Sequence, residues 1–147
     1  MLIDDVNNIL YILQRDSLEE DFSIENIPFF QVLEAAIVEE EHVVNLYPKE
    51  GLLGSTLVNN EGIMDEDLDE DEEDDEEEFI EALCLKIVVD DLTNPILEYP
   101  FIEYGKSLEI DSEEYMEANS LCNEWYQKLC IIIKRYEHDK VVVRLWQ

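Results

Sequence analysis

The chain has 147 residues, and its 39 Asp and Glu side chains against 9 Lys and Arg give a formal net charge of -30 at pH 7. This balance argues against nucleic acid and anionic membrane as direct ligands, because phosphate binding needs clustered Lys and Arg. Hydrophobic residues make up 46% of the chain and aromatic residues 10%, enough to build a core. We therefore expect one folded acidic domain over residues 1–147.

The N-terminal segment has apolar residues at helical spacing and predicts a first helix that ends near Arg15. The apolar positions are Leu2, Val6, Ile9, Leu10 and Leu13. Asp4 and Asp5 interrupt this pattern and no positive region precedes it, so a secretory signal peptide is not expected. With three cysteines that form no even disulfide framework, the sequence favours a cytoplasmic protein.

The segment from Asn26 to Tyr47 fits two structures. Phe30, Leu33 and Ile37 suit a helix, while its β-branched and aromatic content suits a hairpin that turns within residues 39–42. The sequence leaves open whether residues 28–47 form a helix or a hairpin.

An acidic insert is predicted over residues 63–79, after several Gly and Asn residues that break the chain. Between Asp65 and Glu78, 13 of 14 side chains are acidic, and such a run is typical of disordered or weakly ordered chain. It matches an EF-hand loop at several positions, but Glu70 stands where the turn requires Gly, so no metal site is expected. Its candidate partner-binding residues are Asp65, Glu66, Asp67, Asp69, Glu70 and Asp71.

Beyond the insert, alternating apolar residues predict a buried strand over Ala82–Val89 and, after a turn at Asn94–Pro95, one or two extended pieces within Ile96–Ile110. Asp111 or Ser112 is expected to cap a helix that runs to about Leu129, with Glu114 as the capping-box partner of Asp111.

This helix carries two stripes of different character. The apolar stripe is expected to face the core and consists of Tyr115, Ala118, Cys122, Trp125 and Leu129. Glu113, Glu117 and Glu124 share another face at about 6 and 10 Å along the axis, a spacing that can imitate a row of phosphates. They are the remaining candidate partner-binding residues.

The last piece predicts a hairpin of Cys130–Arg135 and Val141–Trp146, since both segments are β-branched and lack Gly and Pro. The expected fold is thus α+β: a small antiparallel sheet packed against two or three helices. Residues 128–147 hold five Lys and Arg against two Asp and Glu, so the local charge is +3 and a head-to-tail homodimer is a further option.

The order of these elements, with the helix motif A-N-x-x-C-N-E-W-Y (Ala118–Tyr126) before IIIKRY and KVVVRLW, resembles the C-terminal half of the YbjN-like family. The likeness covers roughly Leu83–Gln147 and implies a fold similar to type III secretion chaperones and a binding role without catalysis. The acidic insert departs from the family pattern.

No nucleophile elbow, phosphate-binding Gly loop or zinc-ligand spacing is present, so the sequence predicts no enzyme, no catalytic residue, no cofactor and no metal. The charge instead predicts a basic protein surface as partner. Three hypotheses follow: a DNA mimic that inhibits a nucleic-acid-binding protein, of the anti-restriction or anti-CRISPR type; a YbjN-like chaperone or adaptor for a basic client; or an acidic housekeeping domain or enzyme.

Overall fold

Two antiparallel sheets and one long helix make up the main body of this computed structural model, which describes residues 1–15, 19–47 and 78–145. The first sheet has the order β1-β2-β3, with β1 at Leu2–Asp4, β2 at Ile9–Gln14 and β3 at Ser23–Pro28. The second has the order β5-β4-β7-β8, with β4 at Val32–Glu39, β5 at His42–Tyr47, β7 at Leu83–Val89 and β8 at Ile96–Pro100. A short 3-10 turn, η1 at Phe29–Gln31, joins β3 to β4, and β6 at Phe79–Ile80 pairs with β9 at Leu108–Glu109.

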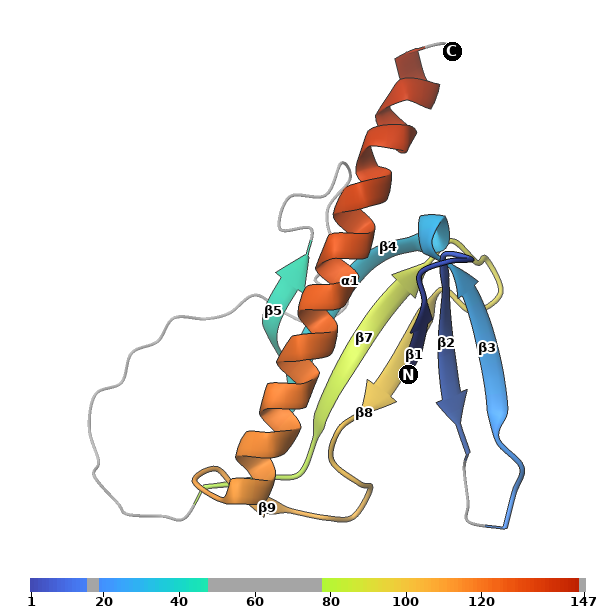
Figure 1. Cartoon of the computed structure of the whole chain (residues 1–147). Coiled ribbons are helices and arrows are strands. Elements are labelled where there is room, and N and C mark those ends of the chain that lie inside the picture. Colours follow the sequence, from blue (N-terminus) through green and yellow to red (C-terminus); the bar gives the residue numbers. More distant parts are fainter. Residues whose placement is uncertain (16–18, 48–77, 146–147) are drawn as a thin grey trace, which may run out of the picture.

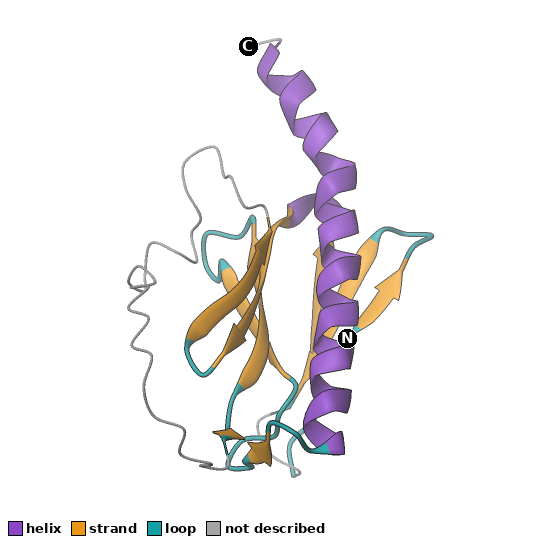
Figure 2. Cartoon of the chain, turned by 90° about the vertical axis from the view of Figure 1, so that its left-hand side faces the viewer, coloured by secondary structure: helices purple, strands orange, loops and turns teal. Residues whose placement is uncertain are grey.

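The α+β class and the antiparallel pairing are confirmed, but the number of helices was wrong. Within the described residues one α-helix is present, α1 at Glu113–Leu145, instead of two or three. Figures 1 and 2 show α1 and the three-stranded sheet on the same face of the four-stranded sheet. The domain therefore has two layers, one of which is shared by a helix and a sheet.

The expected N-terminal helix is instead the β1–β2 hairpin. The Asp4 carboxylate accepts hydrogen bonds from the backbone N–H groups of Val6 and Asn7 at 3.1 and 3.0 Å, and Asn8 adopts a positive φ of 57°. Asp and Asn side chains offer the backbone this alternative to a helix. Val6, which belonged to the helical pattern, is 84% exposed on the turn.

The segment that the sequence left open forms the β4–β5 hairpin, with the turn within residues 39–42. Glu39 pairs with His42, so the loop consists of Glu40 and Glu41, and both have positive φ, 47° and 70°. Two positive φ values in a two-residue loop are the pattern of a type I′ turn. The strand predicted over residues 82–89 and the extended pieces after it are confirmed as β7, β8 and β9.

Helix α1 starts as expected but continues where a hairpin was predicted. The Ser112 Oγ accepts the backbone N–H of Tyr115 at 3.2 Å and caps the helix, while Glu114 forms an ion pair with Lys106 instead of a capping box. Beyond Leu129, buried Ile132 and Ile133 continue the apolar stripe at helical spacing. Packing of these two side chains on the sheets outweighs their β propensity, so the predicted strands were wrong.

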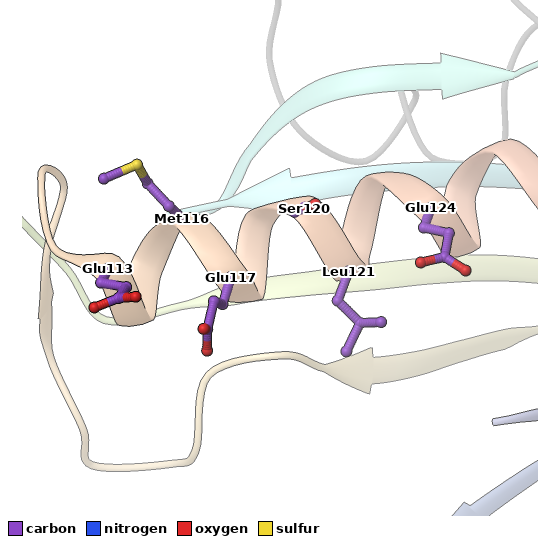
Figure 3. A pocket seen from close by; sticks show the side chains of 6 residues that line it. All are labelled: Glu113, Met116, Glu117, Ser120, Leu121 and Glu124. Atoms are coloured by element: carbon purple, nitrogen blue, oxygen red, sulfur yellow. The ribbon is translucent and has the colours of Figure 1, made fainter.

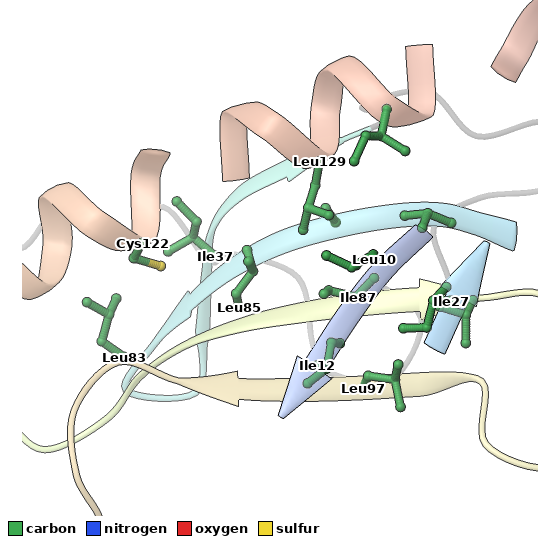
Figure 4. Close-up of a cluster of buried hydrophobic side chains, with 14 of the residues drawn as sticks. Leu10, Ile12, Ile27, Ile37, Leu83, Leu85, Ile87, Leu97, Cys122 and Leu129 are labelled. Carbon is green, nitrogen blue, oxygen red and sulfur yellow. The ribbon is translucent and has the colours of Figure 1, made fainter. Parts of the chain in front are cut away.

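The core lies between the two layers. Figure 4 shows side chains of β2, β4, β7 and α1 that meet there, and the fully buried ones include Leu10, Ile37, Leu85, Ile87 and Leu129. The predicted core stripe of α1 is confirmed, with Tyr115, Cys122 and Leu129 buried and Ala118 and Trp125 packed against the cluster. This packing fixes which face of α1 remains outside.

Candidate functional site: an acidic end of the domain

Carboxylates from four separate parts of the chain gather at the end of the domain where α1 begins. They come from the β4–β5 turn, the β6 strand with its flanks, the β8–β9 segment, and the first turns of α1. We call this surface the acidic end and define it as Glu39, Glu40, Glu41, Glu78, Glu81, Glu103, Glu109, Asp111, Glu113, Glu114 and Glu117. All except Glu39 and Glu40 are exposed.

Backbone contacts hold these parts together. The Glu40 N–H donates to the Ala82 carbonyl at 3.1 Å, and the Glu40 carboxylate accepts the backbone N–H groups of Glu81 and Ala82. The Ile110 N–H donates to the Glu78 carbonyl at 3.0 Å. The β4–β5 turn, β6 and the approach to α1 are thus bound to one another.

A side-chain hydrogen bond ties the turn to the helix. The Tyr115 hydroxyl, on a buried ring of α1, donates to the Glu39 carboxylate at 2.5 Å. Burial, with the hydrogen bond and the Glu39 charge beside it, raises the pKa of Tyr115 to about 12. The phenol therefore stays protonated and keeps donating across the neutral range.

Little positive charge balances this surface. Lys106 lies at the acidic end and forms an ion pair with Glu114 at 2.9 Å, which raises the Lys106 pKa. Glu40, Glu41 and Glu81 line a shallow hollow with Lys106 and the loop at Tyr104. On the other side of Lys106, Glu103, Glu114 and Glu117 contribute to a second hollow, most of whose remaining lining is apolar.

The three helix glutamates predicted as partner-binding residues lie along one hollow on the surface of α1, with Met116, Ser120 and Leu121 between them (Figure 3). Glu124 differs from the other two, since its carboxylate contacts the Lys128 ammonium at 2.7 Å. Lys128 thus offsets the Glu124 charge, and the row of uncompensated charge ends at Glu117.

The other predicted partner-binding residues, Asp65, Glu66, Asp67, Asp69, Glu70 and Asp71, lie outside the described residues, as does the predicted insert up to residue 77. Its last two residues are described: Glu78 directly precedes β6 at the acidic end, and Phe79 is the first residue of that strand. Sequence reasoning missed Glu40, Glu41, Glu81 and Glu103 as members of one surface. Their only local signal was the Glu39–Glu41 triplet, because the rest meet through tertiary contacts.

The described thiols are poorly suited to nucleophilic chemistry. Burial raises the pKa of Cys122 to about 12 and that of Cys84 to about 11, so both stay protonated at neutral pH. Among the residues that the structure describes, no group of three His, Cys, Asp or Glu side chains could hold a metal ion.

Fold and site together define a small α+β protein with a strongly acidic end. Comparisons with protein-family models, curated proteins and solved structures gave no match. Over its described ranges, the chain has no helix that is both long and apolar enough to cross a membrane.

Proposed function

We propose that this protein is a non-enzymatic, cytoplasmic DNA mimic whose acidic end occupies the basic surface of a nucleic-acid-binding protein and so inhibits it. The anti-restriction or anti-CRISPR type of inhibitor is the class that fits this chemistry. No cofactor is needed for such a role, because the charged surface itself is the ligand. Glu78, the last residue of the acidic run at residues 65–78, directly precedes β6 at the acidic end.

One observation carries the proposal: two glutamates occupy a turn whose backbone conformation favours Asn and Gly. Glu40 and Glu41 both have positive φ, which is strained for residues with a side chain. Strain of this kind persists where the surrounding structure or the function maintains it. Glu40 has a structural role, because its carboxylate accepts hydrogen bonds from the link between β6 and β7. For Glu41, no contact within the described residues accounts for a glutamate at this position, which leaves its charge as the reason.

The spacing of the charges on α1 sets how much charge the other segments have to contribute to this role. Glu113 and Glu117 lie one helical turn apart, about 6 Å along the axis. In a DNA duplex each strand carries one charge per about 3.4 Å of helix axis. The helix alone is therefore sparser than one DNA strand, and the carboxylates of the β4–β5 turn and the β8–β9 segment have to supply the rest of the charge density.

A competition experiment tests the proposal. Immobilised protein is exposed to cell lysates, and bound proteins are eluted with duplex DNA at constant salt, using the whole chain and a variant without residues 65–77. We expect a nucleic-acid-binding protein to be released by DNA from both. If DNA and this protein bind that partner at the same time, the proposal is wrong.

A matched pair of variants locates the binding surface. Glu41→Gln, Glu81→Gln and Glu117→Gln together remove three charges from the acidic end, and Glu19→Gln with Glu20→Gln and Glu25→Gln removes three exposed charges from the β2–β3 hairpin. We expect the first set to weaken binding about tenfold and the second less than about twofold, because complementary charges act mainly within a Debye length. Equal losses of binding affinity in the two sets would mean that the acidic end is not the interface.

A chaperone or adaptor for a basic client is the second candidate, and one surface favours it. Leu13, Phe22 and Ile24 are 38%, 56% and 59% exposed on the β2–β3 hairpin, where Leu13 pairs with Ile24. An apolar patch of this kind marks a contact surface for another protein. A complex held by this patch would survive high salt and would not be released by DNA, whereas a mimic complex would dissociate in both.

A further inference from the structure

A groove runs between β1 and α1, away from the acidic end. Its apolar lining includes Leu2 of β1, Phe29 of η1, and Ile131 and Ile132 of α1, and α1 also contributes Lys128 and Arg135. Phe29 and Ile132 are buried, whereas Leu2 and Ile131 are 55% and 54% exposed. The hollow has a volume of about 560 Å³, with an apolar floor and two cations among its walls.

The strand beside this groove has an unused edge. In the sheet order β1-β2-β3, β1 pairs only with β2 among the described strands, and Figure 1 shows β1 as the strand of its sheet nearest to α1. The outer edge of β1 therefore presents backbone N–H and C=O groups that pair with no strand in the part of the chain that the structure describes. Such an edge is a template for an added strand from another chain.

The charge at the groove indicates which chain would bind. Among the side chains that the structure describes, which end at Glu137, Arg135 forms no ion pair. Lys128 lies 4.6 Å from the centre of the Trp125 ring and forms an ion pair with Glu124. Asp5 is the acidic residue in the lining. In a chain of net charge -30, two cations on one apolar groove mark a local site for carboxylates.

We propose that this groove binds an extended acidic segment of a partner protein, which adds to β1 as a strand, places apolar side chains on the groove floor and directs carboxylates to Arg135 and Lys128. The dimensions agree with this arrangement. From Trp125 to Arg135 the helix rises about 15 Å, the length of a strand of about five residues. Lys128 and Arg135 lie about 10 Å apart along the axis. Side chains on one face of a strand lie about 7 Å apart at positions i and i+2 and about 13 Å apart at i and i+4, so the spacing of the two cations falls between these values.

Direct binding with Trp125 as the reporter tests the proposal. Replacing the only other tryptophan by Trp146→Phe leaves Trp125 as the single indole, and its emission is followed as peptides of about ten residues are added. One peptide alternates Glu and Val, a second alternates Lys and Val, and a third is the Glu-Val peptide with every second backbone nitrogen methylated. Salt is held at about 0.15 M, where the Debye length of about 8 Å screens the repulsion from distant acidic residues.

We expect the Glu-Val peptide to bind about tenfold more tightly than the Lys-Val peptide and the methylated one. Arg135→Glu should abolish the preference for acid, while Lys134→Glu, the same charge change at an exposed neighbouring residue outside the groove, should preserve it. Equal affinity for the acidic and basic peptides, equal effects of the two variants, or no change in Trp125 emission with any peptide would overturn the proposal. So would sedimentation showing a dimer that Arg135→Glu dissociates, since a second copy would then occupy the groove.

Discussion

The strained turn of the β4–β5 hairpin provides the sharpest test of how this protein uses its charge. Glu41 has a φ of 70°, a conformation that glycine adopts freely and that brings the Cβ of other residues too close to the backbone. Replacing Glu41 by Gly removes both the Cβ and the carboxylate, and replacing it by Ala removes the carboxylate alone. The difference between the two variants therefore isolates the backbone strain from the charge.

The expected difference follows from two opposing terms. The left-handed conformation costs a residue with a Cβ roughly 1–2 kcal/mol. Glycine avoids this cost, but its greater conformational freedom in the unfolded chain lowers the free energy of unfolding by roughly 0.4–1 kcal/mol. The free energy of unfolding of Glu41→Gly should thus exceed that of Glu41→Ala by about 0.5–1 kcal/mol, which corresponds to a melting temperature about 1–4 °C higher.

Thermal unfolding of both variants by circular dichroism measures this difference, and binding to the partner is measured in parallel. Both variants should lose the same binding affinity, because both lack the carboxylate. Glu41→Gly would then be more stable than the natural chain but would bind the partner more weakly. This is expected if the natural glutamate lowers the stability of the turn and contributes to binding through its charge. A Glu41→Gly variant no more stable than Glu41→Ala would refute the claim that the turn is strained.

Three further predictions concern the supports of the acidic end and the core. Glu40→Ala removes the acceptor for two backbone N–H groups and should lower the free energy of unfolding by about 1–3 kcal/mol in urea titrations, and no loss would show that water replaces the carboxylate. Folding raises the Tyr115 pKa from 10 to about 12, so the contribution of Tyr115 to stability is complete below pH 10 and decreases as the pH rises toward 12. The Tyr115→Phe variant cannot donate a hydrogen bond to Glu39, so it should be less stable at neutral pH and should lack this decrease in urea titrations at several pH values. Leu129→Ala should cost about 2–5 kcal/mol of unfolding free energy and Leu121→Ala, on the exposed face of the same helix, less than about 1 kcal/mol; similar losses would mean that α1 does not bury the Leu129 face.

The two proposed surfaces carry charges of opposite sign. The acidic end offers carboxylates from several segments, while the groove beside β1 offers Lys128 and Arg135 on an apolar floor. A protein with both could bind a basic target at one surface and an acidic segment at the other. The experiments on the two surfaces use different residues and different ligands, so either proposal can fail without the other.

Wherever local pattern and tertiary packing favour the same structure, the sequence alone predicted the element. Residues 83–89 alternate as a buried strand should, and the stripe from Tyr115 to Leu129 has the period of a helix that packs on a core. The α+β class followed from these segments. The net charge of -30, with the basic partner surface that we infer from it, is likewise a property of composition alone.

Only the tertiary structure decided the remaining elements, because their local signals conflict with the contacts that they make. Residues 2–13 have helical spacing, yet the Asp4 turn and pairing with β3 make them strands, while the β-branched residues after Leu129 stay helical because Ile132 and Ile133 reach the same core. The acidic end joins residues as far apart in sequence as Glu40 and Ala82 through hydrogen bonds, and the groove joins β1 to α1. Sequence periodicity describes one segment at a time, so surfaces assembled from several segments follow only from the way those segments pack.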